Sequence, residues 1–191
     1  MVDRRGAVLF DLDGTLTVKY LDFDAIRAEI GITGGPILEA IADMDDVARA
    51  RASRILDRHE RDAAEASELH PGARETIAAL RSRGWRVGIV TRNARRWATF
   101  VLSRHGVDVD GLWSREDGAI KPDPAGPLAL CAAFGAEPGR SWMVGDYRFD
   151  IEAGVRAGMR TVLMIGDDAA PPYAADADYV IRRLDELLGM V

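Results

Sequence analysis

The sequence predicts an α/β fold: a Rossmann-like three-layer sandwich with a mostly parallel sheet, plus a small α-helical cap. Short apolar runs alternate with segments of helical spacing along most of the chain, as in parallel strands joined by helices. The runs are apolar throughout, which is typical of strands buried on both faces. One long stretch near the start contains no convincing strand and interrupts this alternation.

The alternation defines each element in turn. The predicted strands are Ala7–Phe10, Arg86–Thr91, Trp142–Gly145, Thr161–Ile165 and a short edge strand at Tyr179–Ile181. The predicted helices are Thr76–Arg83, Ala94–His105, Pro124–Phe134, Phe149–Ala157 and Leu184–Leu188. Glycine follows several of these helices, and glycine is the usual residue just past a helix end.

The stretch without strands reads as a helical insertion. Asp22–Ile30 has helical spacing, Gly31–Pro36 has the composition of a turn, and Asp45–Leu69 reads as a long helix rich in alanine and charge. We therefore expect a catalytic core formed by residues 1–16 and 70–191, with residues 17–69 as the cap.

Composition excludes several classes of protein. The 191 residues carry a formal net charge of −6, which argues against binding to nucleic acid or to an anionic membrane surface. Hydrophobic residues make up 48%, enough for a sizeable core, and no apolar run is long enough to cross a bilayer. Met1–Arg5 shows no signal-peptide pattern, and Cys131 is the single cysteine, so we expect a cytoplasmic protein without an internal disulfide.

Polar residues gather where the predicted strands end. In a parallel α/β sheet, ligands bind at the carboxyl ends of the strands, so these residues are expected to meet at one edge. Asp11 and Asp13 follow the first strand, and Lys121 lies in a loop that opens a helix. The full set expected at this edge is Asp11, Asp13, Thr91, Arg92, Asn93, Lys121, Asp146 and Asp150.

These residue types fit phosphoryl chemistry. Crowded carboxylates repel one another and need a counter-charge, which Mg²⁺ and Lys121 can supply. Thr91 and backbone N–H groups can hold phosphate oxygens. One carboxylate can attack phosphorus to form an aspartyl-phosphate, while another moves protons.

The motifs resemble those of the haloacid dehalogenase superfamily of aspartate-nucleophile phosphatases. DLDGT at Asp11–Thr15, Thr91, Lys121, and Gly145-Asp146 with Asp150 match its four motifs in order. The resemblance covers the whole chain, and the insertion lies where the family places its helical cap. TRN at the second motif and KPDP at the third are closest to the branch of phosphoglycolate phosphatases and phosphomutases, although the insertion is shorter than is usual there.

The resemblance implies a role for each matching residue. Asp11 would be the nucleophile and a Mg²⁺ ligand, and Asp13 the general acid/base, with its backbone carbonyl also on the metal. Asp146 would ligate Mg²⁺ directly, and Asp150 would do so through water or support the ligands.

The same resemblance assigns the phosphate contacts. Thr91 would bind phosphate together with neighbouring backbone N–H groups, and Lys121 would stabilise both the carboxylates and the phosphate. Arg92 and Asn93 are further candidates for contact with phosphate or substrate, or are plain loop residues. Tyr147 departs from the family pattern, since many relatives have a small hydroxyl residue there.

The expected function is Mg²⁺-dependent hydrolysis of a small phosphorylated metabolite, with phosphoglycolate or a sugar phosphate as the best guesses. The alternative is a phosphomutase that uses the same aspartyl-phosphate. A non-catalytic binding protein is less favoured because none of the charged motif residues is missing. A dehalogenase is disfavoured by the acid at Asp13. We expect a monomer or homodimer.

The leaving group has no motif of its own. Candidates to read it lie in the insertion: Arg27, Arg54, Arg58 and His59. Most charges on such helices are merely solvated, so these residues are weaker candidates than the motif residues.

Overall fold

The computed structural model describes residues 6–191. The expectation made for Met1–Arg5 falls outside this range. The described chain forms two compact units: one contains the residues up to Lys19 together with Glu68–Val191, and the other is Tyr20–Ser67. Assignment of the insertion as a cap, with boundaries 17–69, remains a prediction, because compactness alone gives neither unit a role.

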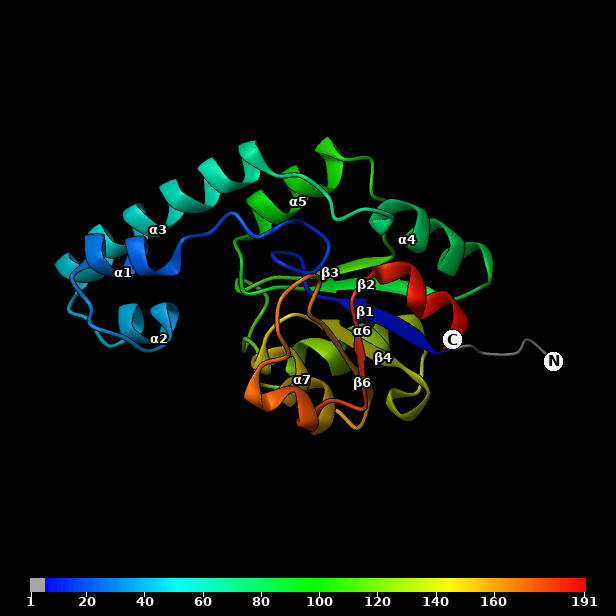
Figure 1. The fold of residues 1–191 in the computed structure, drawn as a ribbon. Coiled ribbons are helices and arrows are strands. Elements are labelled where there is room, and N and C mark those ends of the chain that lie inside the picture. The colour runs from blue at the N-terminus through cyan, green and yellow to red at the C-terminus, as the bar shows by residue number, and fades with distance from the viewer. Residues whose placement is uncertain (1–5) are drawn as a thin grey trace. The chain divides into compact units, whose positions relative to one another are not determined.

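The larger unit is built on a six-stranded sheet in which every strand pair is parallel (Figure 1). Its strands are β1 (Ala7–Phe10), β2 (Arg86–Val90), β3 (Gly111–Trp113), β4 (Trp142–Gly145), β5 (Arg160–Met164) and β6 (Tyr179–Ile181). Their spatial order is β3-β2-β1-β4-β5-β6. The chain thus builds outward from β1 in one direction and then crosses back to β4, so a topological switch point lies between β1 and β4.

Helices cover both faces of the sheet, which confirms the predicted three-layer α/β fold. They are α4 (Ala73–Ser82), α5 (Arg95–Arg104), α6 (Ala125–Phe134) and α7 (Arg148–Arg156), with 3₁₀ helices η1 (Pro138–Arg140), η2 (Pro172–Asp176) and η3 (Leu184–Gly189). In Figure 1, α4, α5 and η3 lie on one face and α6 and α7 on the other.

The sheet is central because β1 is apolar on both sides. All four residues of β1 are fully buried. One core cluster places Leu9, Val90 and Met143 from the sheet against Leu130 and Cys131 of α6. Burial of this kind stabilises the folded state by roughly 25 cal/mol for each Å² of apolar surface that is removed from water.

One strand and one α-helix of the described chain were not predicted from the sequence, and neither were the 3₁₀ helices η1 and η2. β3 has three residues of intermediate exposure, so it lacks the apolar signature that identified the other strands. The six-residue helix α2 (Ile37–Ala42) follows a turn rich in glycine, and Pro36 is its N-cap residue. The last predicted helix, Leu184–Leu188, is 3₁₀ rather than α.

The smaller unit holds three helices around its own core. They are α1 (Phe23–Ile30), α2 (Ile37–Ala42) and α3 (Asp46–Ala66). Their buried apolar residues are Ile26, Ile37, Ile41, Ala52 and Leu56. Asp22 and Asp45 cap α1 and α3, each accepting hydrogen bonds from two backbone N–H groups of the first turn. The unit is therefore locally stabilised without any strand.

The two connections to the insertion are joined at their base. Thr17 and Leu69 form an antiparallel bridge. The N–H of Val18 donates to the carbonyl of Glu68 at 2.9 Å, and that of His70 donates to the carbonyl of Leu16 at 2.8 Å. These bonds close the larger unit on itself where the insertion leaves it. Among the described residues, no helix combines the length and apolar character that crossing a membrane requires.

Candidate active site

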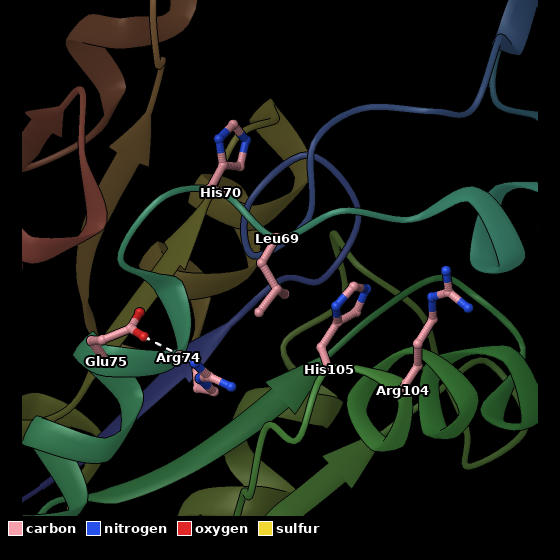
Figure 2. A pocket seen from close by; sticks show the side chains of 6 residues that line it. All are labelled: Leu69, His70, Arg74, Glu75, Arg104 and His105. Atoms are coloured by element: carbon pink, nitrogen blue, oxygen red, sulfur yellow. Dashed lines mark hydrogen bonds and ion pairs between the residues drawn. The ribbon is translucent and has the colours of Figure 1, made fainter.

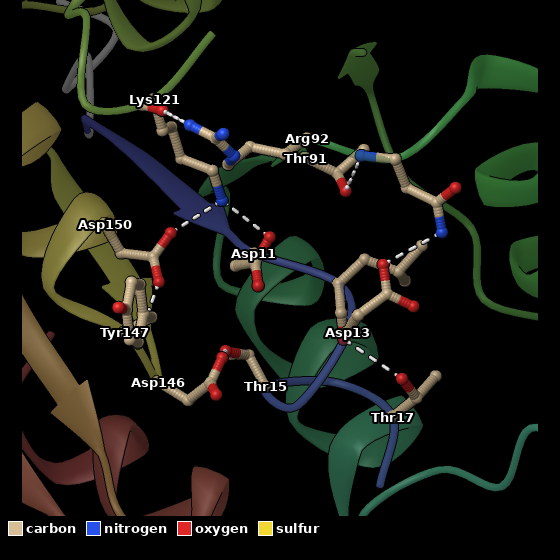
Figure 3. A network of polar contacts seen from close by, with 12 residues as sticks. Asp11, Asp13, Thr15, Thr17, Thr91, Arg92, Lys121, Asp146, Tyr147 and Asp150 are labelled. Carbon is tan, nitrogen blue, oxygen red and sulfur yellow. Dashed lines mark hydrogen bonds and ion pairs between the residues drawn. The ribbon is translucent and has the colours of Figure 1, made fainter. Parts of the chain in front are cut away.

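The predicted polar residues meet at the carboxyl edge of the sheet (Figure 3). Asp11 follows β1, Thr91 follows β2, and Asp146 follows β4, whereas Lys121 comes from the loop before α6. This edge contains the switch point between β1 and β4, where crossing connections leave room for a ligand. The larger unit alone therefore brings the motif residues together.

Lys121 lies between two buried carboxylates. Its Nζ is 2.6 Å from Asp11 Oδ1 and 2.6 Å from Asp150 Oδ1. Burial raises the pKa of Asp150 to about 7, against the attraction of Lys121, and repulsion from Asp11 adds to the rise. Burial also raises the pKa of Asp11. One ammonium thus serves two carboxylates, and the cluster holds an excess of negative charge.

Burial acts on Lys121 in the opposite sense. By itself burial would lower the pKa of Lys121, but the attraction of Asp11 and Asp150 outweighs it, so the pKa lies above its usual value. Lys121 is 3% exposed. A fixed, charged ammonium at this position suits the stabilisation of an anion bound next to Asp11.

Three carboxylates could hold a metal ion. Oxygens of Asp11, Asp146 and Asp150 lie within 4.8 Å of one another. Carboxylate oxygens are the ligands that hard divalent cations prefer, and such a cation would balance the excess negative charge. Asp150 is placed as a supporting member, because its two oxygens accept from Lys121 Nζ and from the backbone N–H of Tyr147 at 3.0 Å.

Asp146 has partners on both oxygens. Thr15 Oγ1 donates to Oδ1 at 3.1 Å, and Lys19 Nζ is 2.9 Å from Oδ2. The Lys19 side chain is 56% exposed, so it brings a positive charge to the solvent side of the cluster. Burial alone would lower the pKa of Lys19, but Asp146 raises it. Sequence reasoning missed Lys19, which belongs to none of the motifs.

Two glycines let these carboxylates approach the backbone. Gly14 has φ of +95°, and a Cβ added there would lie 2.5 Å from Asp146 Oδ2. A Cβ on Gly145 would lie 2.1 Å from the Cγ of Asp150. Both distances are far below a normal contact, so a side chain at either position would displace a predicted metal ligand.

Asp13 is held by the second motif. Asn93 Nδ2 donates to Asp13 Oδ2 at 3.0 Å, while Asn93 Oδ1 accepts from the N–H of Ala94 at 2.7 Å. The Thr91 hydroxyl accepts from the N–H of Asn93 at 3.0 Å and is buried. Asn93 thus orients Asp13. Its predicted contact with substrate, like that of Thr91, remains a prediction.

Arg92 links two loops of the site. Its Nη1 donates to the carbonyl of Lys121, and its guanidinium lies 4.7 Å from the centre of the Phe149 ring. These contacts place Arg92 beside the cluster and help to fix the Lys121 loop. Its predicted contact with phosphate remains a prediction.

An aromatic cluster formed by Tyr147, Phe149 and Tyr173 lies beside the carboxylates and was not predicted. The Tyr147 ring is 5.0 Å from that of Phe149 and 5.9 Å from that of Tyr173, nearly perpendicular to each. Tyr173 donates to the carbonyl of Asp146 at 3.3 Å. Tyr147 was noted as a departure from the family pattern, but Tyr173 is distant in sequence, and only the fold brings the three together.

Three of the insertion's candidates for leaving-group contact have partners inside their own unit. Arg58 pairs with Glu29, and His59 Nε2 is 2.9 Å from the same carboxylate. These contacts join α3 to α1, so they account for both residues without a substrate. Arg27 likewise pairs with Asp24, at 2.7 Å.

A separate pocket of about 390 Å³ lies in the larger unit (Figure 2). It is lined by Leu69, His70, Arg74, Glu75, Arg104 and His105. None of the predicted catalytic residues lines it. His70 precedes α4, and His105 is the C-cap of α5.

The sequence matches the haloacid dehalogenase-like hydrolases over residues 6–158, which is most of the chain. The chain belongs to this family. The matched range includes the segments that carry Asp11, Thr91, Lys121 and Asp146.

Named relatives of this family member are phosphatases. It is 30% identical to phosphoglycolate phosphatase of Haemophilus influenzae, covering 95% of this chain and 96% of the relative. It is 32% identical to N-acetylmuramic acid 6-phosphate phosphatase of Pseudomonas aeruginosa, covering 98% and 95%. The first alignment spans 217 positions, more than the 191 residues of this chain, so that relative has residues lacking here.

Solved structures of the family share the fold. A hydrolase from Pseudomonas syringae superposes with a TM-score of 0.83 at 21% identity, covering 97% of both chains. A predicted phosphoglycolate phosphatase from Haemophilus somnus gives 0.78 at 21% identity, covering 100% of this chain and 99% of the other. At this level of identity the likeness supports the fold and no particular substrate.

Proposed function

We propose that this hydrolase is a Mg²⁺-dependent phosphatase that cleaves a small phosphomonoester through an aspartyl-phosphate on Asp11. The observation that carries the proposal is the cluster in which Lys121 Nζ and the oxygens of Asp146 and Asp150 surround Asp11 at the end of β1. An acid two residues further on, Asp13, supplies the second group that phosphoryl transfer needs.

In the first half-reaction, Asp11 attacks phosphorus. Lys121 holds Oδ1 of Asp11, and we assign the attack to the other oxygen, Oδ2. The new bond joins this oxygen to phosphorus, and the bond from phosphorus to the ester oxygen breaks. Asp13 donates a proton to the departing oxygen, so the leaving group departs as a neutral alcohol.

In the second half-reaction, water replaces the enzyme's carboxylate. Asp13, now ionised and oriented by Asn93, takes a proton from the water as it attacks phosphorus. The bond between phosphorus and Asp11 breaks, which releases inorganic phosphate and restores the carboxylate of Asp11 and the protonated form of Asp13. Lys121 and the backbone N–H groups near Thr91 hold the phosphoryl oxygens through both steps.

Asp11, Asp146 and the backbone carbonyl of Asp13 would hold the Mg²⁺ ion, with Asp150 in support. When bound, the ion would offset the charge of the transferring phosphoryl group. The carboxylate oxygens of this cluster fit a hard divalent cation, and the two ammonium groups of Lys121 and Lys19 are too little positive charge for three acids.

The substrate is a small phosphorylated metabolite. Relatives named as phosphatases of phosphoglycolate and of N-acetylmuramic acid 6-phosphate support phosphoglycolate or a sugar phosphate as first candidates. We keep the cytoplasm as the proposed location and a monomer or homodimer as the proposed state. The single buried cysteine is compatible with a reducing compartment.

The first test replaces the proposed nucleophile. Asp11→Asn should lower phosphate release from p-nitrophenyl phosphate and from a metabolite panel by at least about a thousand-fold, because the amide cannot attack phosphorus. EDTA should abolish release by the wild type, and excess Mg²⁺ should restore it. Thermal unfolding would show that the variant remains folded.

A matched control is Asp43→Asn, which alters an exposed carboxylate of the smaller unit. It should retain wild-type release. Substantial activity in Asp11→Asn would refute the mechanism, and no release from any phosphomonoester would refute phosphatase function. Formation of an isomeric sugar phosphate without free phosphate would identify the phosphomutase alternative instead.

A further inference from the structure

Tyr147 is an exposed aromatic residue among buried catalytic groups. Asp11, Thr91, Lys121 and Asp150 are all buried, yet Tyr147, which directly follows Asp146, is 44% exposed. Its backbone N–H is hydrogen-bonded to Asp150. The residue is therefore attached to two members of the carboxylate cluster, and its ring stands at the solvent side of that cluster.

Helix capping at the start of α7 does not require a tyrosine at position 147. Tyr147 occupies the N-cap position, where Ser, Thr, Asp and Asn are preferred because a short side chain can accept from the first turn. The bond that Tyr147 makes here is from its backbone N–H to Asp150 Oδ2, and any residue except proline could donate it. A departure from local preference at a site residue is a feature of function.

The Tyr147 ring is held in a fixed orientation. It meets the Phe149 and Tyr173 rings at interplanar angles of 84° and 72°. Phe149 is in turn contacted by two guanidinium groups, with Arg92 at 4.7 Å and Arg148 at 5.2 Å from its centre. The ring is thus pre-oriented while much of its surface stays in solvent, which lowers the entropic cost of stacking a ligand on it.

The anchors of the aromatic cluster are parts of the reaction site. Tyr173 donates to the carbonyl of Asp146, and Arg92 donates to the carbonyl of Lys121. The cluster therefore extends from the loop after β5 to the loop after β2, along the edge at which the phosphoryl group binds. Tyr147 is the only member of this cluster that is classed as exposed, so it is the member that a leaving group at this edge could contact.

We infer that Tyr147 stacks against a flat, aromatic leaving group of the substrate, so that among small phosphorylated metabolites the core favours those whose alcohol carries an aromatic ring over phosphoglycolate and sugar phosphates. This inference rests on the proposed phosphatase function. Aromatic pairs contribute beyond the area that they bury, which favours a planar ring over a saturated ring of the same size.

The test compares two probes that differ in the ring alone. Benzyl phosphate and cyclohexylmethyl phosphate are both esters of a primary alcohol, with six-membered rings of similar size. Wild-type kcat/KM should favour benzyl phosphate, and Tyr147→Ser should reduce that preference by roughly 2- to 12-fold, as expected for loss of one aromatic pair. Tyr147→Phe should retain the preference.

The control applies the same substitution elsewhere. Tyr179 at the start of β6 is 42% exposed, so Tyr179→Ser removes a comparable ring and should leave the ratio of the two probes unchanged. Because the readout is a ratio, a general loss of stability or activity cancels. Thermal unfolding shows what fraction of each variant is folded at the temperature of the assay.

Each outcome decides between distinct conclusions. Equal reduction for both probes in Tyr147→Ser would show a structural role and overturn the inference. A wild type that cleaves both probes equally would overturn it too, while leaving phosphatase function intact. A wild type that cleaves neither probe nor any metabolite phosphate would overturn the proposed function itself.

Discussion

Lys121 has to neutralise two carboxylates that the fold has already buried. Asp11 is 9% exposed and Asp150 is 2% exposed, so solvent screens neither. The pairing at 2.6 Å to each carboxylate stabilises their ionised forms, but a single positive charge leaves one of them incompletely compensated. Burial, together with repulsion from Asp11 that Lys121 does not fully offset, raises the pKa of Asp150 to about 7.

This imbalance gives a pH dependence of stability. From about pH 4 to about pH 7, the folded protein binds more protons than the unfolded chain, because the pKa of Asp150 is raised on folding. The contribution of Asp150 to the free energy of unfolding is therefore highest below about pH 4 and falls as the pH rises to about 7. Relative to Asp150→Asn, wild type should lose about 3 kcal/mol of unfolding free energy between pH 4.5 and 7.5 in EDTA.

Urea unfolding at the two pH values measures this difference. Excess Mg²⁺ should reduce it in the wild type, because a bound cation favours the ionised carboxylates. Asp178→Asn serves as the control variant, because it changes an acid outside the carboxylate cluster, one that accepts from the N–H of Thr161 in β5. A gap between wild type and Asp150→Asn that is constant with pH would contradict the assignment.

Single residues of the site could be predicted where a motif specified them. The sequence alone identified Asp11, Lys121 and Asp150, and the fold adds how they pair. Lys19 and Tyr173 carried no such signal, because their contacts with Asp146 depend on where two distant loops return to the sheet. Tyr147 could be noticed as unusual, but its neighbours could not be deduced from spacing.

Among the elements, predictability followed burial. β1 and β4 were predicted with the observed boundaries because every residue in them is buried and apolar. β3 could not be, since its residues are half-exposed and it is only three residues long. α3 was expected at Asp45–Leu69 and runs Asp46–Ala66, with Asp45 as its N-cap, so its start was specified by a side chain that the sequence displays.

The N-cap of α3 provides an element-scale prediction. Asp45 Oδ1 accepts from the N–H groups of Val47 and Ala48, at 3.0 Å and 2.9 Å. Asp45→Ala should destabilise the protein by about 1 kcal/mol, because these donors lose their partner. Asp46→Ala is the matched control: it removes only an exposed pair with Arg49, worth about 0.2–0.5 kcal/mol. Equal losses in urea unfolding would contradict a capping role.

At the scale of the whole molecule, the larger unit contains every residue of the proposed chemistry. The insertion leaves and re-enters through connections that are hydrogen-bonded to each other at Leu16–His70 and Val18–Glu68. The sheet's core therefore does not depend on residues 20–67 to close its chain. The fold class could be predicted because the alternation of elements is regular, whereas the substrate could not, since the insertion holds no motif.

A deletion tests this division. Replacing residues 20–67 with a Gly/Ser loop of about five residues should leave a unit that unfolds cooperatively, because its sheet and linker bonds are retained. It should still release phosphate from p-nitrophenyl phosphate but discriminate less among metabolites. Calorimetry and the substrate panel measure the two effects. A broad, non-cooperative transition would show that the larger unit depends on the insertion.

The ion pair of Lys19 has a practical consequence. The sequence contains two lysines, Lys19 and Lys121, although it carries 25 lysines and arginines in all. Lys121 is buried, whereas the Lys19 side chain is more than half exposed beside Asp146. Of the two lysines, Lys19 is therefore the one that an amine-directed fluorophore can reach, and a label there would lie beside Asp146 without an engineered cysteine.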